Sequence, residues 1–89
     1  MELLFFSSPT CGKCKTVYEW WNAFVADNTW LDFKIIDTSL SLDEARKYEI
    51  RSLPSFVLRD GDGVYLAHIS DTPARGAVER MVEKFRGSA

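Results

Sequence analysis

Long apolar runs, runs of like charge and abundant cysteine are all missing from this sequence. The first apolar run, residues 3–6, is too short for a signal-peptide core or a membrane span, and an acidic residue precedes it. The 11 basic and 13 acidic residues are mixed along the chain, which gives no indication of nucleic-acid binding. Two cysteines without a secretory signal favour redox-active thiols or metal ligands over a structural crosslink. We therefore expect a cytoplasmic protein that binds neither nucleic acid nor membrane.

The sequence does contain enough apolar residues for one core. They make up 46% of the 89 positions and include six Phe, three Trp and three Tyr. That share is typical of a globular chain, and the length suffices for one domain but not for two. The sequence predicts a single domain over residues 1–89.

The first half of the chain predicts a strand, a helix and a second strand. Residues 3–6 form a continuous apolar run typical of a buried strand. In residues 11–27, apolar side chains recur at helical spacing, which predicts an amphipathic helix that begins at the cysteines. On this helix we expect Trp20 and Trp21 to lie in the core. Residues 33–37 are rich in aromatic and β-branched side chains, and predict a strand parallel to the first.

The second half predicts a short helix and a hairpin. Ser41 followed by Glu44 is a capping-box pattern that starts a helix. This helix must end before Pro54, which disfavours the helical conformation in the residue preceding it. Two strand-like runs, 55–59 and 64–69, are separated by Asp-Gly-Asp-Gly, a strong hairpin signal.

A last helix follows the hairpin, with Asp71 or Thr72 as its cap and Pro73 in its first turn. The predicted order is β-α-β-α-β-β-α, an α/β fold. Burying the apolar helix faces predicts a four-stranded mixed sheet with helices on both sides. The loop that carries Cys11 then lies at the carboxyl end of a central strand, where open α/β sheets place their functional sites.

Cys11 and Cys14 stand three residues apart at a predicted helix start, with Gly12 and Lys13 between them. The unpaired N–H groups and the dipole at a helix start stabilise a thiolate, which is the reactive form of cysteine. Lys13 and Lys15 add positive charge nearby. We expect the pKa of Cys11 to lie below the value of about 8.5 of a free thiol.

The expected reaction is thiol–disulfide exchange. Cys11 attacks a substrate disulfide, and Cys14 resolves the mixed disulfide that results. Two alternatives stay open: a zinc-binding adaptor in which the cysteine pair and His68 hold the metal, and a non-catalytic binding module.

The sequence resembles the thioredoxin superfamily through Ser8-Pro9-Thr10-Cys11-Gly12-Lys13-Cys14-Lys15 and Ile50-Arg51-Ser52-Leu53-Pro54-Ser55-Phe56. The resemblance covers nearly the whole chain and implies a minimal thioredoxin fold. It also implies that Pro54 follows a cis peptide bond opposite the cysteines, and that the Leu53 backbone pairs with an extended substrate segment. The expected substrate contacts are Thr10, Gly12, Leu53, Pro54 and Asp71.

The chain departs from the thioredoxin pattern at two places. Thioredoxins usually have Trp before the first cysteine and Gly-Pro between the two, where this chain has Thr10 and Gly12-Lys13. They also carry a buried Asp six residues before the first cysteine, where this chain has Phe5. The group that takes the proton from Cys14 is therefore open, with Lys13, Lys15 and Asp37 as candidates.

Glutaredoxins resemble the chain in length and in the early position of the cysteines. Of their glutathione-binding segment only Asp71, with Thr72 beside it, has a counterpart here. We expect a glutaredoxin-sized monomer with thioredoxin-like specificity and no tightly bound cofactor, as in small electron donors to ribonucleotide reductase. Its partners would be protein disulfides on one side, and a thioredoxin reductase or glutathione on the other.

Overall fold

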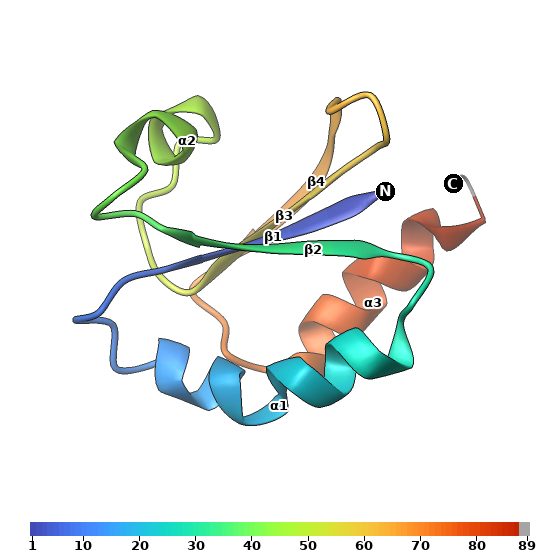
Figure 1. Ribbon diagram of the computed structural model, residues 1–89, viewed down its shortest axis with the longest axis horizontal. Coiled ribbons are helices and arrows are strands. Elements are labelled where there is room, and N and C mark those ends of the chain that lie inside the picture. Colours follow the sequence, from blue (N-terminus) through green and yellow to red (C-terminus); the bar gives the residue numbers. More distant parts are fainter. Residues whose placement is uncertain (88–89) are drawn as a thin grey trace.

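The computed structural model describes residues 1–87, and residues 88–89 of the predicted domain lie outside the described part. Its elements follow the predicted order β-α-β-α-β-β-α (Figure 1). They are β1 (Glu2–Ser7), α1 (Cys14–Asp27), β2 (Asp32–Asp37), α2 (Leu42–Lys47), β3 (Ser55–Arg59), β4 (Tyr65–Ser70) and α3 (Arg75–Arg86). None of the helices between residues 1 and 87 combines the length and the apolar character that crossing a bilayer requires.

The four strands form one mixed sheet in the order β2-β1-β3-β4. β2 runs parallel to β1, whereas β3 is antiparallel to both β1 and β4. β1 therefore lies in the interior of the sheet, and its Phe5 is paired with Ile35 on one side and Phe56 on the other. This arrangement confirms the predicted α/β fold and the central position of the first strand.

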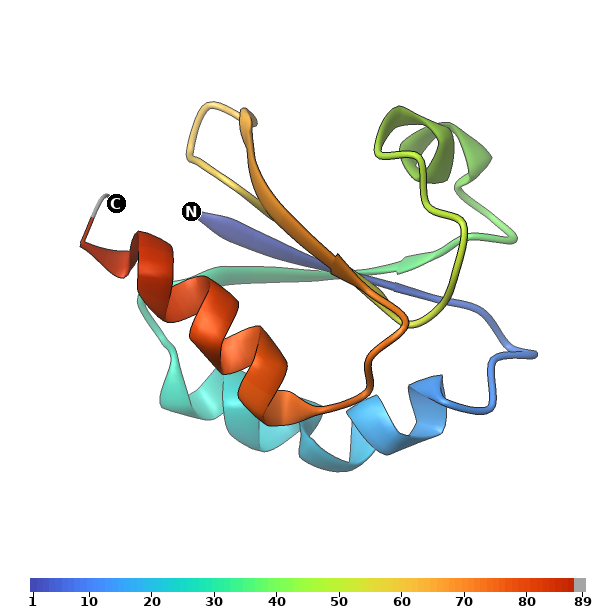
Figure 2. The same cartoon turned by 180° about the vertical axis from the view of Figure 1, so that it is seen from behind.

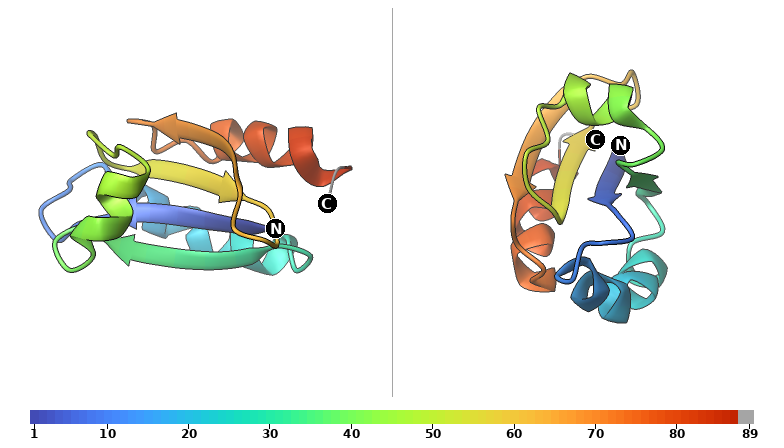
Figure 3. Two further views of the ribbon diagram at one scale, coloured as in Figure 1. Left: turned by 90° about the horizontal axis from the view of Figure 1, so that it is seen from above. Right: turned by 90° about the vertical axis from the view of Figure 1, so that its left-hand side faces the viewer.

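The helices lie on both faces of the sheet, as predicted, but unequally. Both long helices, α1 and α3, cover one face, and only the short α2 lies over the other (Figures 1 and 3). The alternation of side chains along β1 explains how one strand serves both layers. Leu3 and Phe5 pack with residues of α1 and α3, whereas Leu4 and Phe6 pack in the smaller cluster with Tyr48.

Aromatic rings dominate the core beneath α1 and α3. Phe5 is completely buried and its ring centroid lies 5.1 Å from that of Phe56 and 5.2 Å from that of Trp21. Trp21 is buried as expected, whereas Trp20 is half-buried and donates a 2.8 Å hydrogen bond from Nε1 to the carbonyl of Pro73. Trp20 thus packs on the core and also fastens the segment before α3 to α1.

Helix α1 begins at Cys14 rather than at Cys11, so the predicted start is wrong by three residues. The amide of Cys11 donates to the carbonyl of Ser8 at 3.2 Å, which closes a turn in the loop before the helix. The amide of Lys15 bonds back only to Gly12, three residues before, at 3.3 Å. The segment from Ser8 to Lys13 is therefore a series of turns that delivers Cys11 ahead of the helix.

The predicted side-chain caps are also wrong. Ser41 occupies the cap position of α2, but its side chain makes no capping hydrogen bond. α3 begins at Arg75 with Ala74 at its cap position, so Pro73 precedes the helix instead of lying in its first turn. Thr72 accepts a 3.3 Å hydrogen bond from the Ala74 amide in the linker, before the helix begins. Asp71, the other predicted cap, is instead held in the left-handed region at φ 55°.

Polar side chains connect β1, β3 and α2 at the end of the sheet where β1 begins. Arg59 on β3 donates from Nε to the carboxylate of Glu2 on β1 at 2.7 Å, and from Nη1 to the Tyr48 hydroxyl at 3.1 Å. The hydrogen bond to Tyr48, followed by the bond to Glu2, raises the pKa of the Arg59 guanidinium. This network links two strands to the end of α2.

Candidate functional site

Cys11 and Cys14 form a disulfide at the carboxyl end of β1, with a Cα–Cα distance of 5.4 Å. Cys14 is buried in the first turn of α1, whereas Cys11 is half-buried in the loop before it. The amide of Cys14 donates to Cys11 Sγ over 3.1 Å. A backbone N–H at the helix start therefore points at the more accessible sulfur, where it would stabilise a thiolate.

The loop before β3 carries the second part of the site. The Leu53–Pro54 peptide bond is cis, as the resemblance implies, and Pro54 is buried while Leu53 is half-buried. Leu53 and Cys11 pack against the same core cluster. The Pro54 carbonyl accepts a 2.9 Å hydrogen bond from the amide of Asp71. The loops before α1 and β3 and the linker before α3 thus lie at one end of the sheet (Figures 1 and 2).

Lys13 and Asp71 join these loops directly. Their side chains form an ion pair of 2.7 Å between Nζ and Oδ1, and both remain more than half exposed. The sequence predicted one as a thiolate-stabilising cation and the other as a substrate contact, but not that they pair. A carboxylate in this position would offset part of the positive charge that the sequence assigned to Lys13.

A small pocket of about 290 Å³ opens beside the disulfide. Both cysteines line it together with Lys15, Tyr18 and Asp37. Two of the three candidates for taking the Cys14 proton therefore lie next to it, and Lys13 does not line this pocket. Asp37 accepts hydrogen bonds from the Ser39 amide and hydroxyl at 2.9 and 2.6 Å.

The other predicted contact residues lie on the outside of the disulfide loop. Thr10 and Gly12 are exposed on either side of Cys11, and a Cβ placed at Gly12 would meet no atom within 4 Å. Thr10 makes only a local contact, with its hydroxyl 3.3 Å from that of Ser8. Cys11 therefore has no large side chain at either neighbouring position.

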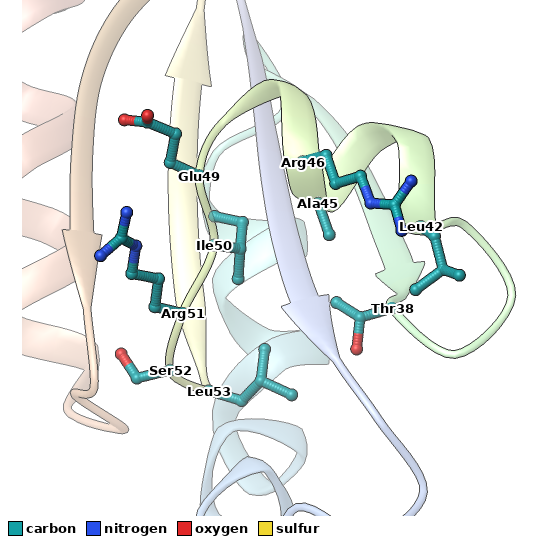
Figure 4. Close-up of a pocket in the computed structure, with 9 residues that line it drawn as sticks. All are labelled: Thr38, Leu42, Ala45, Arg46, Glu49, Ile50, Arg51, Ser52 and Leu53. Carbon is teal, nitrogen blue, oxygen red and sulfur yellow. The ribbon is translucent and has the colours of Figure 1, made fainter.

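A larger groove, of about 490 Å³, lies between α2 and the segment that leads to Leu53 (Figure 4). Apolar side chains and two arginines line it, and Leu42 is 56% exposed at the start of α2. The lining residues are Thr38, Leu42, Ala45, Arg46, Glu49, Ile50, Arg51, Ser52 and Leu53. Sequence reasoning missed this groove, because the exposure of Leu42 becomes known only once α2 is placed on the sheet.

The described residues offer no group of three or more side chains from His, Cys, Asp and Glu that could hold a metal ion. His68, which the zinc alternative required, lies on β4 and lines pockets on that side of the molecule. Within residues 1–87, the structure therefore does not bring the predicted third ligand to the cysteine pair.

Comparison with known proteins adds three findings. The sequence model of the family described as Thioredoxin matches residues 1–84. No curated protein sequence matches the chain. Among solved structures, mitochondrial thioredoxin 3 from Saccharomyces cerevisiae is similar with a TM-score of 0.85 and 24% identity, covering 93% of this chain and 76% of that one. Thioredoxin from Fasciola hepatica gives a TM-score of 0.86 at 19% identity, covering 93% and 78% of the two chains. A thioredoxin from Nicotiana alata gives 0.85 at 25% identity, covering 93% and 70%.

Proposed function

Since this chain belongs to the thioredoxin family, we propose that it is a thiol–disulfide oxidoreductase that reduces disulfides in protein substrates through Cys11 and Cys14. The observation that carries the proposal is the asymmetry of the pair. One sulfur is half-buried and accepts the amide hydrogen bond at the helix start, and the other is buried one turn further on. Such a pair has one thiol to attack and one to resolve.

The reaction runs in two exchanges. The Cys11 thiolate attacks one sulfur of the substrate disulfide, the substrate S–S bond breaks, and the other substrate sulfur leaves as a thiolate that takes a proton from water. Cys14 then loses its proton, to Asp37 or to water in the adjoining pocket, and attacks Cys11. The bond between Cys11 and the substrate breaks, and the second substrate sulfur leaves as a thiolate that takes a proton from Asp37 or water. Two electrons have passed to the substrate, and this chain holds the Cys11–Cys14 disulfide.

The substrate segment binds in extended form along the loop before β3. The half-buried Leu53 offers its backbone to such a segment as an added strand, beside the buried Pro54. The groove in Figure 4 continues from Leu53 along α2 and supports this proposal, since it gives side chains that flank the substrate cysteine an apolar surface beside Arg46. Thr10 and Gly12 leave room for the substrate on the other side of Cys11.

The electron donor is a second part of the proposal. A dedicated thioredoxin reductase would return the disulfide to the dithiol in a reducing compartment such as the cytoplasm, and ribonucleotide reductase is one proposed acceptor. Glutathione is the alternative reductant. It would bind during turnover and dissociate afterwards, so it would not be a tightly bound cofactor. Because Asp71 is paired with Lys13, glutathione would have to compete with that ammonium for the carboxylate.

Insulin reduction with dithiothreitol as donor tests the proposal. We expect turnover by the natural chain and none by Cys11→Ser. Reduced Cys14→Ser mixed with insulin without dithiothreitol should give a trapped mixed disulfide. The reduction potential then separates the donors, because a value near about −270 mV suits a reductase-linked thioredoxin and one of about −200 to −230 mV suits glutathione coupling. A folded chain with no turnover and no reversible dithiol couple would favour the binding-module or zinc-adaptor alternatives instead.

A further inference from the structure

The outer edge of β4, on the flank of the sheet away from β2, carries features that the redox reaction does not use. β4 ends the sheet, so one row of its backbone N–H and C=O groups has no strand beside it among the described residues. The Asp71 amide bonds the Pro54 carbonyl across the β3–β4 ladder. Because antiparallel pairs alternate, the amides and carbonyls of His68 and Ser70 point outward.

α3 runs back alongside this edge in the opposite direction to β4 (Figures 2 and 3). Between the strand and the helix lies a groove of about 610 Å³. Its floor is apolar, and consists of Ala67, Ile69, Ala77, Met81 and Phe85. An open strand edge and an apolar groove therefore lie side by side, which is the arrangement that strand addition by another chain requires.

Arg80 and Lys84 line the same groove from α3. They stand four residues apart on one helix face, where two like charges repel each other. The acidic residues of α3 do not relieve them, since Glu79 pairs with Arg75 and Glu83 pairs with Arg86. In residues 1–87 neither Arg80 nor Lys84 has a carboxylate within ion-pair distance. A chain with a net charge of −2 thus presents two unneutralised cations beside an open strand edge.

The spacing of the two cations fits a strand. Four residues of helix rise about 6.0 Å, and two residues of a strand rise about 6.6 Å. Carboxylates at alternate positions of an extended segment on β4 would therefore fall opposite Arg80 and Lys84 in turn. The methylene stems of the same glutamates would cover the apolar floor.

We propose that the groove between β4 and α3 binds an extended segment of a partner protein that carries acidic residues at alternate positions, added as a fifth strand at the β4 edge. The backbone of His68 and Ser70 supplies the hydrogen bonds, and Arg80 and Lys84 select for negative charge. This surface lies apart from the cysteine pair, so binding here leaves Cys11 free for exchange.

The test uses the full chain and a cysteine-free probe, the acetylated and amidated peptide Val-Glu-Val-Glu-Val-Glu-Val. We expect saturable changes in the amide NMR signals of residues 65–70 and of α3, weakening as salt screens the charges. The double variant Arg80→Glu/Lys84→Glu should bind at least about tenfold more weakly. Lys34→Glu, a single charge reversal at the opposite edge strand β2, should bind as the natural chain does.

A second arm does not depend on the folding of the double variant. The peptide with Lys in place of each Glu should fail to bind the natural chain under the same conditions. Equal binding of the two peptides, full affinity in a folded double variant, or signal changes around Cys11 and Leu53 instead of β4 would each overturn the proposal. So would a concentration-dependent dimer that covers the β4 edge, because the occupant would then be a second copy. Insulin reduction is measured separately, so failure here leaves the proposed redox function standing.

Discussion

The ammonium of Lys13 and the carboxylate of Asp71 lie 2.7 Å apart, although 58 positions separate them in the sequence. The amide of the same Asp71 holds the Pro54 carbonyl. One residue in the linker before α3 therefore contacts both the disulfide loop and the proline loop. Its carboxylate pairs with the disulfide loop, and its amide holds the proline loop.

Removal of the Asp71 carboxylate should lower the pKa of Cys11 and so favour its thiolate form. In Asp71→Asn, Lys13 has no carboxylate partner, so we expect the pKa of Cys11 in the reduced protein to fall, and only slightly because the pair is exposed. A titration followed by thiolate absorbance measures it. Asp43→Asn, which removes an exposed carboxylate from α2, should leave the Cys11 pKa unchanged. An unchanged or higher Cys11 pKa in Asp71→Asn would mean that the carboxylate does not act on the sulfur.

Phe5 should be among the costliest side chains to truncate. It is completely buried and contacts the rings of Tyr18, Trp21 and Phe56. We expect Phe5→Ala to lower the free energy of unfolding by about 3–5 kcal/mol, measured by urea denaturation. Val64→Ala, at a side chain that is 57% exposed, should change it by less than about 0.5 kcal/mol. A comparable loss in both variants would contradict this account of the core.

The two hairpin glycines should respond differently to alanine. Gly63 has φ +83°, in the left-handed region, and a Cβ there would meet no atom within 4 Å. The cost of Gly63→Ala is therefore conformational, about 1 kcal/mol in the free energy of unfolding. Gly61 has the same open surroundings without the positive φ, so Gly61→Ala should be neutral or slightly stabilising. Equal thermal midpoints for the two variants would refute the conformational argument.

The indole of Trp20 should contribute through its hydrogen bond as well as its ring. Trp20→Phe keeps an aromatic ring but removes the 2.8 Å bond to Pro73, so we expect a loss of about 1 kcal/mol in the free energy of unfolding. Amide exchange in residues 72–75 should also become faster, because this bond fastens the linker to α1. Trp30→Phe is the matched control, since the Trp30 bond to Asn28 is longer, at 3.4 Å. A larger effect at Trp30 would point to ring packing as the cause.

Sequence patterns predicted the elements of this fold because the relevant signals are local and strong. The short apolar run of residues 3–6 fitted a buried central strand, and Asp-Gly-Asp-Gly marked the turn between β3 and β4. Helix starts were predicted less well. A side chain such as that of Ser41 can hydrogen-bond to several nearby backbone groups. Which bond forms depends on tertiary packing, which a sequence pattern does not contain.

The site was predicted in part for the same reason. The motif around Cys11 and Cys14 is contiguous, and Pro54 stood out through the family pattern. The pairing of Lys13 with Asp71 depends on how two distant loops meet, which no local spacing encodes. The grooves beside α2 and α3 likewise arise only when helices are placed on the sheet.

The place of β1 in the sheet bears on how the protein is made. β1 precedes all its neighbours in the chain, and Glu2 contacts Arg59, 57 residues later. During synthesis from the amino end, the four apolar side chains Leu3, Leu4, Phe5 and Phe6 emerge before β2 and β3 exist to cover them. An apolar strand that is exposed before its partner strands are synthesised can associate with other chains. β1 therefore stays without its sheet neighbours until residue 59 has left the ribosome, and the core around Leu3 and Phe5 can close only when α3, which contributes Val78, Met81 and Val82, has followed.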